Sequence, residues 1–289
     1  SEAKKILQQT WEPVEQVGEK CRKPFECNFI GYCNPNLPGV EYPIEILPYG
    51  KKKIDELKEL GFNNLLDVPA ELLSDPKHIR VHAVSLSGEA FLDDEAGRQL
   101  RILPFPRYYL DFETIAFAIP IWRGVRPFMQ IPFQWSCHVE SEDGEIRHAE
   151  FLDISGADPR VHFIESLIDV IGSEGAVIVY NAAFEGARIH ELAQAYPEHS
   201  AKLLAIKDRF FDLLPMARNY YYHPSMMGSW SIKKVLPTIA PELDYSKLEI
   251  GDGGMAQEAY VEAIGDQTLA DRKSHLFQEM LKYCKQDTL

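Results

Sequence analysis

The chain lacks a hydrophobic run long enough to cross a membrane. No stretch of its 289 residues approaches the ~18 consecutive apolar residues that a spanning helix needs. Residues Ser1 to Lys5 show no signal-peptide pattern. We therefore expect a cytoplasmic protein with no membrane partner. An initiator methionine is also absent, and the last residues read as part of a helix, so we expect both ends to be trimmed from a longer protein.

Cysteine is scarce and odd in number, which argues against a disulfide framework in a chain this large. Of the five cysteines, Cys137 and Cys284 lie in strand-like and helix-like contexts and are predicted to be buried. Cys21, Cys27 and Cys33 are evenly spaced in a Pro-rich segment, which indicates a metal or cluster site. A tetrathiolate needs a fourth ligand that is not nearby, so a loop with three free or buried cysteines is the alternative.

Basic residues are outnumbered, with 30 Lys and Arg against 44 Asp and Glu and a net charge of −14. This balance argues against long duplex DNA as a partner, because nucleic-acid-binding surfaces are usually basic. Net charge describes the whole surface, however, whereas binding depends on local clefts, and acidic metal ligands add charge that bound cations would offset. The net charge is therefore compatible with a single-stranded or short nucleic acid, DNA or RNA, as the substrate.

Residues 44–103 predict a small helical region, after an irregular segment over residues 1–43. Ile54, Leu57 and Leu60 follow a helical stripe that Gly61 interrupts, and a second short helix is expected near residues 71–73. The pattern is similar to a helix-hairpin-helix unit, whose turn offers backbone N–H groups to a phosphate. A helical spacer packed by Leu and Ile is the alternative. The polar residues 93–101 are expected to form a connector or a short helix end.

From residue 104 onward the sequence predicts an α/β fold with a mixed sheet flanked by helices. Hydrophobic residues make up 45 % of the chain, which is ordinary for a globular protein. Aromatic and β-branched residues mark two strands and a third follows after an Asp-Gly turn, whereas a short apolar run indicates a buried central strand. The expected strands are 107–113, 132–140, 147–152 and 176–180, and the expected helices are 161–171, 184–195, 212–222, 231–236, 257–264 and 271–288.

Carboxylates recur at positions where strands and helices would aim them at a common point. Asp111 and Glu113 lie two apart on a strand and share a face, and Glu185 lies in the first turn of a helix. Tyr283 and Asp287 lie four apart on one helix face, where a phenol would orient an attacking water. Carboxylates that meet in space need a cation, hard oxygen ligands select Mg²⁺ or Mn²⁺, and two such ions side by side hydrolyse phosphodiesters.

Each of these motifs alone has a simpler explanation. Asp111 and Glu113 would also suit a solvent-facing strand end, and Glu185 would complement a helix dipole. The spacing of Tyr283 and Asp287 is common by chance. The hypothesis of a metal-dependent nuclease therefore depends on the conjunction and order of the motifs.

In that order, the motifs resemble those of the DEDD family of 3′–5′ exonucleases, which have a ribonuclease H-like fold. Residues 111–114 are similar to the first motif of that family, 181–185 to the second, and 283–287 to the third in its tyrosine-bearing subtype. The resemblance covers about residues 104–289. It implies a 3′–5′ exonuclease with two Mg²⁺ or Mn²⁺ ions, metal ligands at Asp111, Glu113 and Asp287, and a water-orienting phenol at Tyr283. Glu185 stands where Asp is usual, with its carboxylate one methylene further out, so a metal contact would be direct or through water.

The whole chain is similar to an uncharacterised group in which this exonuclease domain follows a RecB-type nuclease domain. In that group the RecB part ends in cysteines that bind an iron–sulfur cluster. The resemblance implies that residues 1–43 are the tail of such an upstream nuclease domain, with a cluster in the full-length parent only.

Several further residues are candidates for substrate contacts. Asn181 would hydrogen-bond a phosphate, and Lys233 and Lys234 would contact phosphate as point charges. Trp230 or Tyr221 would stack on a base, although for Trp230 we favour the alternative that it packs in the core. Residues 251–254 are expected to form a flexible Gly-rich loop that would cradle a phosphate. A rival hypothesis, motivated by Glu185 and the acidic surface, is a nucleic-acid-binding or scaffolding domain without activity.

Overall fold

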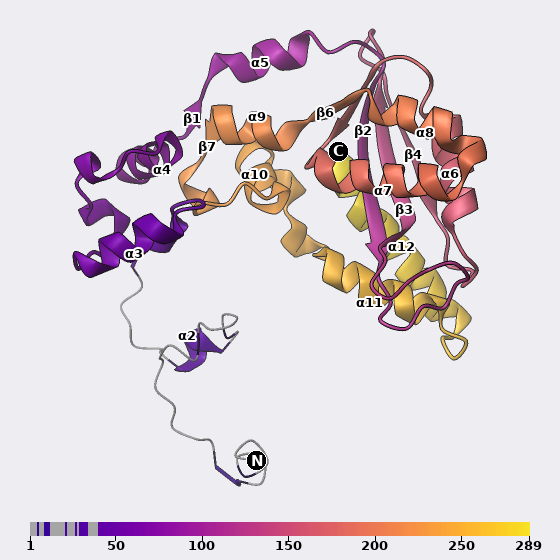
Figure 1. The fold of residues 1–289 in the computed structure, drawn as a ribbon, viewed down its shortest axis with the longest axis horizontal. Helices are drawn as coiled ribbons and strands as arrows, with labels where there is room; N and C mark the ends of the chain where they lie inside the picture. The colour runs from indigo at the N-terminus through magenta and orange to yellow at the C-terminus, as the bar shows by residue number, and fades with distance from the viewer. Residues whose placement is uncertain (1–4, 6–8, 12–20, 22–26, 28, 34–39) are drawn as a thin grey trace.

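The computed structural model describes residues 5, 9–11, 21, 27, 29–33 and 40–289. Figure 1 shows a larger part built on a sheet and a smaller, mostly helical part beside it. Most of the Cys-containing segment lies outside the described residues. Cys21, Cys27 and Cys33 are described as free thiols, the last at the end of the short helix α2 (Ile30–Cys33). The tail interpretation of residues 1–43 stays a prediction.

A mixed sheet forms the larger part, as the sequence predicts, but it has five strands where four were expected, because the short strand β6 precedes the helix predicted from residue 212. Its strands lie in the order β4-β3-β2-β5-β6. The pairs β2–β3 and β3–β4 are antiparallel, whereas β5 and β6 run parallel to β2. The bounds are β2 Arg107–Ile115, β3 Ile131–Glu140, β4 Ile146–Leu152, β5 Ala176–Val179 and β6 Phe210–Asp212.

Helices cover both faces of this sheet (Figure 1). One face carries α6 (Arg160–Val170), α7 (Ala182–Ala195) and α8 (Ser200–Lys207), and the other carries α11 (Gly253–Ile264) and α12 (Ala270–Thr288). All four residues of β5 are buried and apolar because helices shield both of its sides.

Alternation along β2 decides which side chains face which helices. Tyr108, Leu110 and Phe112 belong to the core beneath α6, α7 and α8. The odd-numbered residues of β2 therefore face α12, and Ile115 packs in the core on that side. Asp111 and Glu113 share this second face.

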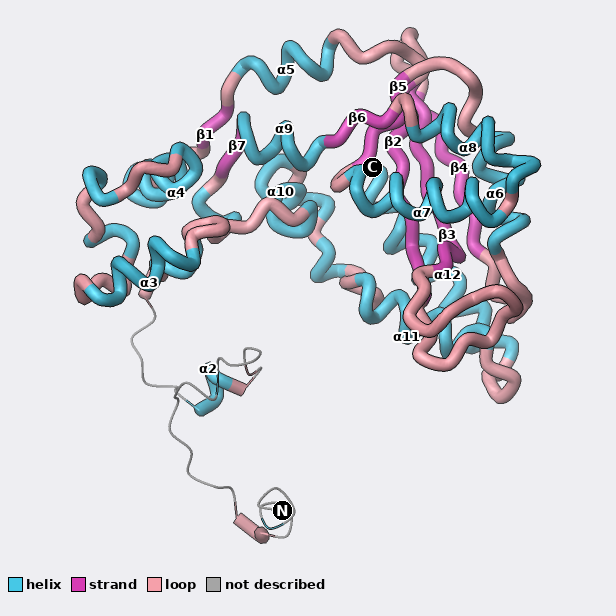
Figure 2. Tube along the Cα trace, viewed as in Figure 1, coloured by secondary structure: helices cyan, strands magenta, loops and turns pink. Residues whose placement is uncertain are grey.

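The smaller part is mostly helix and loop, with one two-stranded ribbon (Figure 2). In the ribbon, β1 pairs antiparallel with β7. The bounds are α3 Lys51–Glu59, α4 Pro76–Ser87, β1 Phe91–Leu92, α5 Asp94–Arg101, α9 Leu213–Tyr220, β7 Tyr221–Tyr222 and α10 Ile232–Ile239. Short 3₁₀ helices complete the chain at Ile44–Ile46 (η2), Leu65–Asp67 (η3), Ala70–Leu72 (η4), Pro197–His199 (η5), Pro224–Met226 (η6), Pro241–Leu243 (η7) and Tyr245–Lys247 (η8).

The core of the smaller part joins two distant stretches of sequence. Leu57 and Val81 from residues 44–103 pack in one cluster with Tyr222, Met226 and Trp230. The helical region predicted over residues 44–103 therefore exists, but its core is completed by the chain between β6 and α10.

The hairpin expected inside this region differs from the prediction in its second half. Gly61 does adopt a left-handed φ of +88° after α3. The chain then forms η3 and η4 before α4, so the helix expected near residues 71–73 is a single 3₁₀ turn. The expected polar connector contains the helix α5, because the Asp93 carboxylate accepts the Glu95 N–H at 2.8 Å and caps its start.

Within the described part of the chain, no helix combines the length and the apolar character needed to cross a bilayer.

Candidate metal and catalytic site

The candidate site lies at the carboxyl ends of the parallel strands. β2 pairs with β5 only as far as Tyr109, opposite Ile178, and Asp111 and Glu113 follow this point. The register of β2 with β3 shifts directly after Glu113. Such bulges are common beside functional sites because they re-aim a side chain.

A third carboxylate reaches this point from α12. Oxygen atoms of Asp111, Glu113 and Asp287 all lie within 4.8 Å of one another. Glu113 is buried, whereas Asp111 and Asp287 are partly buried. The structure thus brings together three side chains that the sequence predicts to meet.

Burial raises the pKa of all three carboxylates when only the chain's own charges are present. Burial, reinforced by the nearby Asp287, raises the pKa of Asp111 well above its usual range. Burial also raises the pKa of Glu113 to about 8, with Asp287 adding to the effect and Lys233 opposing it. The pKa of Asp287 rises to about 6 by burial, although a hydrogen bond from Tyr245 and the charge of Lys233 lower it. A bound cation would remove this penalty, because it favours the ionised form of each ligand.

Glu185 lies in the first turn of α7 and is buried. Its charge raises the pKa of both Asp111 and Glu113, although its carboxylate lies outside the group that meets within 4.8 Å. Burial raises the pKa of Glu185 itself to about 8. Its Oε2 atom has no hydrogen-bond partner among the residues that the structure describes. A buried oxygen without a partner is costly, and this one is suited to a cation ligand, directly or through water.

Tyr283 lies beside the carboxylates, as expected, and Lys233 contacts it. The Lys233 Nζ donates hydrogen bonds to the Tyr283 hydroxyl and to the Gly251 carbonyl, each at 3.0 Å. Burial, followed by the charge of Asp287, raises the pKa of Tyr283, so the phenol stays protonated. Lys233 therefore lies in the carboxylate cluster itself, and its predicted contact with a substrate phosphate stays a prediction.

Sequence reasoning missed Tyr245. Its hydroxyl donates a hydrogen bond to Asp287 Oδ1, and its ring lies 6.4 Å from the Tyr283 ring, centroid to centroid. Tyr245 is contributed by η8, a short element with no motif around it. Only its position in three dimensions reveals that it holds Asp287.

The Gly-rich stretch over residues 251–254 lies at the site, but the flexible loop predicted there is wrong. α11 begins at Gly253, because the Asp252 carboxylate accepts the Met255 N–H at 2.9 Å and caps the helix. A Cβ atom at Gly253 would lie 3.8 Å from Glu113 Oε2. The positive end of the α11 dipole therefore lies close to the Glu113 carboxylate.

Asn181 connects β5 to α7 in a left-handed conformation, with φ of +80°. Asp212 fixes this turn, because its carboxylate accepts the N–H groups of Asn181 and Ala182 at 2.9 and 3.0 Å. The same carboxylate caps α9 through the Leu214 N–H at 2.9 Å. The Asn181 side chain is exposed, and its predicted contact with a phosphate stays a prediction.

Trp230 packs in the core, as the favoured alternative predicts, and the prediction that it stacks on a base is wrong. Its side chain is 4 % exposed, and its Nε1 donates to the Tyr221 carbonyl at 2.8 Å. A buried indole offers no open face to a base. Lys234 is exposed on α10, where its phosphate contact stays a prediction.

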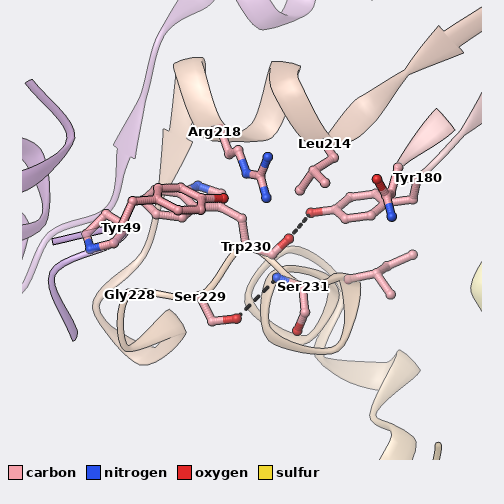
Figure 3. A pocket seen from close by; sticks show the side chains of 11 residues that line it. Tyr49, Tyr180, Leu214, Arg218, Gly228, Ser229, Trp230 and Ser231 are labelled. Atoms are coloured by element: carbon pink, nitrogen blue, oxygen red, sulfur yellow. Dashed lines mark hydrogen bonds between the residues drawn. The ribbon is translucent and has the colours of Figure 1, made fainter. Parts of the chain in front are cut away.

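Two neighbouring cavities open beside the site. The first, about 200 Å³, is lined in part by Asp111 and Asp287. The second, about 540 Å³ and drawn in Figure 3, lies where the smaller part meets the sheet. Tyr180 and Ile232 line both, so the two cavities are adjacent.

Comparison with known proteins links this region to proteins of unknown function. The profile of a domain family of unknown function (DUF2779) matches residues 108–231, which include the first two carboxylate motifs but not Lys233 or Asp287. The uncharacterized protein UU173 of Ureaplasma parvum is 31 % identical over 173 residues, which cover 52 % of this chain and 25 % of that protein.

The uncharacterized protein MG366 of Mycoplasma genitalium is 30 % identical over 200 residues, covering 63 % of this chain and 30 % of the relative. Its homolog in Mycoplasma pneumoniae is 27 % identical over 204 residues, with the same two shares. The chain thus spans 25 to 30 % of the length of the curated relatives that it matches. No solved structure matches the chain.

Proposed function

We propose that the chain carries a metal-dependent 3′–5′ exonuclease domain of the DEDD type, tyrosine subtype, with a ribonuclease H-like fold. Its substrate would be single-stranded or short nucleic acid. The observation that carries the proposal is the convergence of Asp111, Glu113 and Asp287 within 4.8 Å at the carboxyl ends of the parallel strands. The mixed sheet with helices on both faces supports the fold assignment.

The donor set is suited to Mg²⁺ or Mn²⁺, because these cations prefer carboxylate oxygens. Asp111, Glu113 and Asp287 would hold one ion, and Asp111 with Glu185 would hold the second. The buried Glu185 oxygen without a partner supports this second assignment. When bound, such ions lower the pKa of a coordinated water and stabilise the charge of the displaced oxygen.

The chain's own residues would then position the reactants. Tyr283 keeps its hydroxyl proton, and Lys233 fixes that hydroxyl by donating to it at 3.0 Å. The phenol would therefore donate its proton in a hydrogen bond that orients the attacking water. Tyr245 holds the Asp287 carboxylate in place through its own hydroxyl.

A second candidate function is a nucleic-acid-binding or scaffolding domain without activity. Two observations favour it. Glu185 lies outside the closest carboxylate group. The Lys233 ammonium group already lowers the pKa of Glu113 and Asp287, so it would partly neutralise the cluster in place of a cation.

Strand shortening separates the two functions. With Mn²⁺ or Mg²⁺, single-stranded DNA or RNA labelled at its 5′ end should lose nucleotides one at a time from its 3′ end. Asp111→Asn should abolish the loss, because it removes the ligand assigned to both ions. Glu249→Gln should keep full activity, since Glu249 is exposed and belongs to a separate group with His275 and the partly buried Glu279. No shortening of either strand with either cation, or full activity of Asp111→Asn, would contradict the proposal.

A further inference from the structure

The larger of the two cavities is built from both parts of the molecule. Tyr49 comes from the smaller part, Tyr180 and Asn181 from the turn between β5 and α7, and Arg218 from α9. Figure 3 shows Arg218 reaching between Tyr49 and Tyr180, with Ser229 and Ser231 on the opposite side. The cavity of about 540 Å³ is therefore complete only when the two parts are packed together.

The polar groups of this cavity favour an anion. Arg218 is the one basic residue among the described residues that line it, and none of those residues is acidic. This local balance is opposite to the net charge of the whole chain, which is −14. The Asn181 amide and the Ser229 and Ser231 hydroxyls add groups that can donate hydrogen bonds.

Arg218 is held in place, yet part of it lacks a partner. Its guanidinium carbon lies 5.4 Å from the centroid of the Tyr49 ring. Its Nε atom is buried and has no hydrogen-bond partner among the residues that the structure describes. The residue as a whole is only partly buried, and Figure 3 shows its guanidinium group pointing into the cavity, where the terminal nitrogens would bind a phosphate oxygen.

The aromatic wall is suited to a base. The Tyr49 side chain is 74 % exposed, so one of the rings at this cavity is open to solvent. Exposed aromatic rings bind single-stranded nucleic acid by stacking, and nearby cations bind its phosphates. The adjoining cavity reaches Asp111 and Asp287, so a strand whose 3′ end lies at the carboxylates would pass this cavity next.

We propose that this cavity binds a nucleotide of the single strand upstream of the bond at the carboxylates, with its phosphate on Arg218 and its base against Tyr49. The proposal rests on the proposed function for the direction of the strand. The binding itself does not require hydrolysis, and the two can therefore be tested separately.

The first test measures binding without hydrolysis. Dodecamers of thymidylate and of uridylate, labelled with fluorescein at the 5′ end, are titrated with the protein in EDTA and followed by fluorescence anisotropy. Arg218→Gln and Tyr49→Ala should each weaken binding of at least one strand about tenfold, because the first removes the cation for the phosphate and the second removes the ring for the base. Arg147→Gln, an exposed arginine on β4 at the far edge of the sheet, is the matched control and should bind like the wild type.

The second test measures hydrolysis with Mn²⁺. The KM for the dodecamer should rise about tenfold in Arg218→Gln, while kcat stays unchanged. The p-nitrophenyl ester of thymidine 5′-monophosphate has no upstream nucleotide, so its hydrolysis should not change in either variant. Tyr49→Ala keeps the proposal testable if Arg218→Gln does not fold, because Tyr49 is exposed.

The outcomes separate the two proposals. Hydrolysis that depends on Asp111, together with wild-type binding by both Arg218→Gln and Tyr49→Ala, would overturn the cavity proposal alone. Weakened binding in those variants without hydrolysis of any substrate would support the cavity and contradict the exonuclease. Competition by free thymidine monophosphate as strong as that of the dodecamer would show a mononucleotide site and overturn the proposed strand site.

Discussion

At the residue scale, the acidic cluster predicts that stability depends on pH. Burial raises the pKa of Glu113 and of Glu185 to about 8 in the folded chain, so the folded state binds protons that the unfolded state releases. Their contribution to the free energy of unfolding is therefore present at low pH and is lost as the pH rises through about 8. In EDTA we expect Tm to fall by roughly 10 °C or more between pH 6 and pH 8.5, because each group lowers the free energy of unfolding by about 1.4 kcal/mol per pH unit below its folded pKa, and 1 kcal/mol moves Tm by about 2–4 °C in larger domains.

Calorimetric scans across this pH range check the prediction. Saturating Mn²⁺ should abolish most of the fall of Tm with pH. Glu113→Gln should reduce this fall, since the amide does not ionise. The exposed Glu249 provides the control, because Glu249→Gln should leave the change of Tm with pH as it is in the wild type. A Tm that rises from pH 6 to pH 8.5 in EDTA would show that the carboxylates are stabilised as anions by the chain alone.

Substitution of the two tyrosines at the cluster should affect different quantities, the rate of hydrolysis in one case and the affinity for Mn²⁺ in the other. Tyr283→Phe should slow hydrolysis about 10²–10⁴-fold and barely change Mn²⁺ affinity, because its hydroxyl is assigned to the water. Tyr245→Phe should weaken Mn²⁺ binding about 10–100-fold, because its hydroxyl holds Asp287. Single-turnover rates and calorimetric titration measure the two effects. Wild-type rates in Tyr283→Phe would remove the phenol from the mechanism.

The residues that sequence could predict are those in local motifs. Asp111 and Glu113 share a strand face, and Tyr283 and Asp287 share a helix face, so spacing alone places each pair. Tyr245 could not be found in this way, because its contact with Asp287 joins residues 42 positions apart. Trp230 is buried, as the favoured alternative predicts, but no local pattern decides whether an indole is buried.

At the scale of elements, the loop before α10 is fixed by close packing. Gly228 has φ of +77°, and a Cβ atom there would lie 1.8 Å from the Ile46 carbonyl oxygen. Gly144, in the turn between β3 and β4, has φ of +85° but no atom within 4 Å of such a Cβ. Gly144→Ala should thus lower the free energy of unfolding only by the ~1–2 kcal/mol that the left-handed conformation costs a residue with a Cβ atom. Gly228→Ala should lower it clearly more.

Urea unfolding of the two variants measures this difference. The Gly144→Ala variant controls for backbone strain, and the excess in Gly228→Ala reports the clash with the backbone of η2. Equal losses in both variants would mean that the chain around Ile46 moves freely to accept the extra methyl group.

Elements with strong periodicity were predictable, and those set by capping were not. The strands β2 to β5 and the helices α6, α7 and α12 follow their apolar patterns closely. The start of α11 was missed because two glycines usually interrupt a helix, whereas here Asp252 caps it and the small residues allow close approach to Glu113. The sequence predicts a helix at η4 but not its 3₁₀ form, because one turn has too few residues to show a period.

At the scale of the whole molecule, the two parts depend on each other. Tyr222, Met226 and Trp230 are buried in a core that residues 44–84 complete. A chain that begins at residue 104 should therefore expose these side chains, melt at a lower temperature and aggregate, although it still contains every strand of the five-stranded sheet. Thermal melting and light scattering against the chain that begins at residue 40 measure the effect. A truncated chain that melts like the longer one would show that the predicted boundary near residue 104 separates independent domains.

Sequence alone predicted the sheet but not this shared core. Hydrophobic periodicity reports that a helix has an apolar face, and it does not report which distant segment covers that face. The cavity with Arg218 is inaccessible to sequence reasoning for the same reason, since Tyr49, Tyr180 and Arg218 belong to separate elements.

Anomalous diffraction from crystals soaked in Mn²⁺ tests the central claim most directly. We predict two manganese peaks about 4 Å apart. One should be bound by Asp111, Glu113 and Asp287, and the other should lie between Asp111 and Glu185. Asp111→Asn crystals treated in the same way should lose both peaks. A soaked wild-type crystal with no manganese among these four carboxylates, while Lys233 still bonds to Tyr283, would contradict the claim that they form a two-metal site.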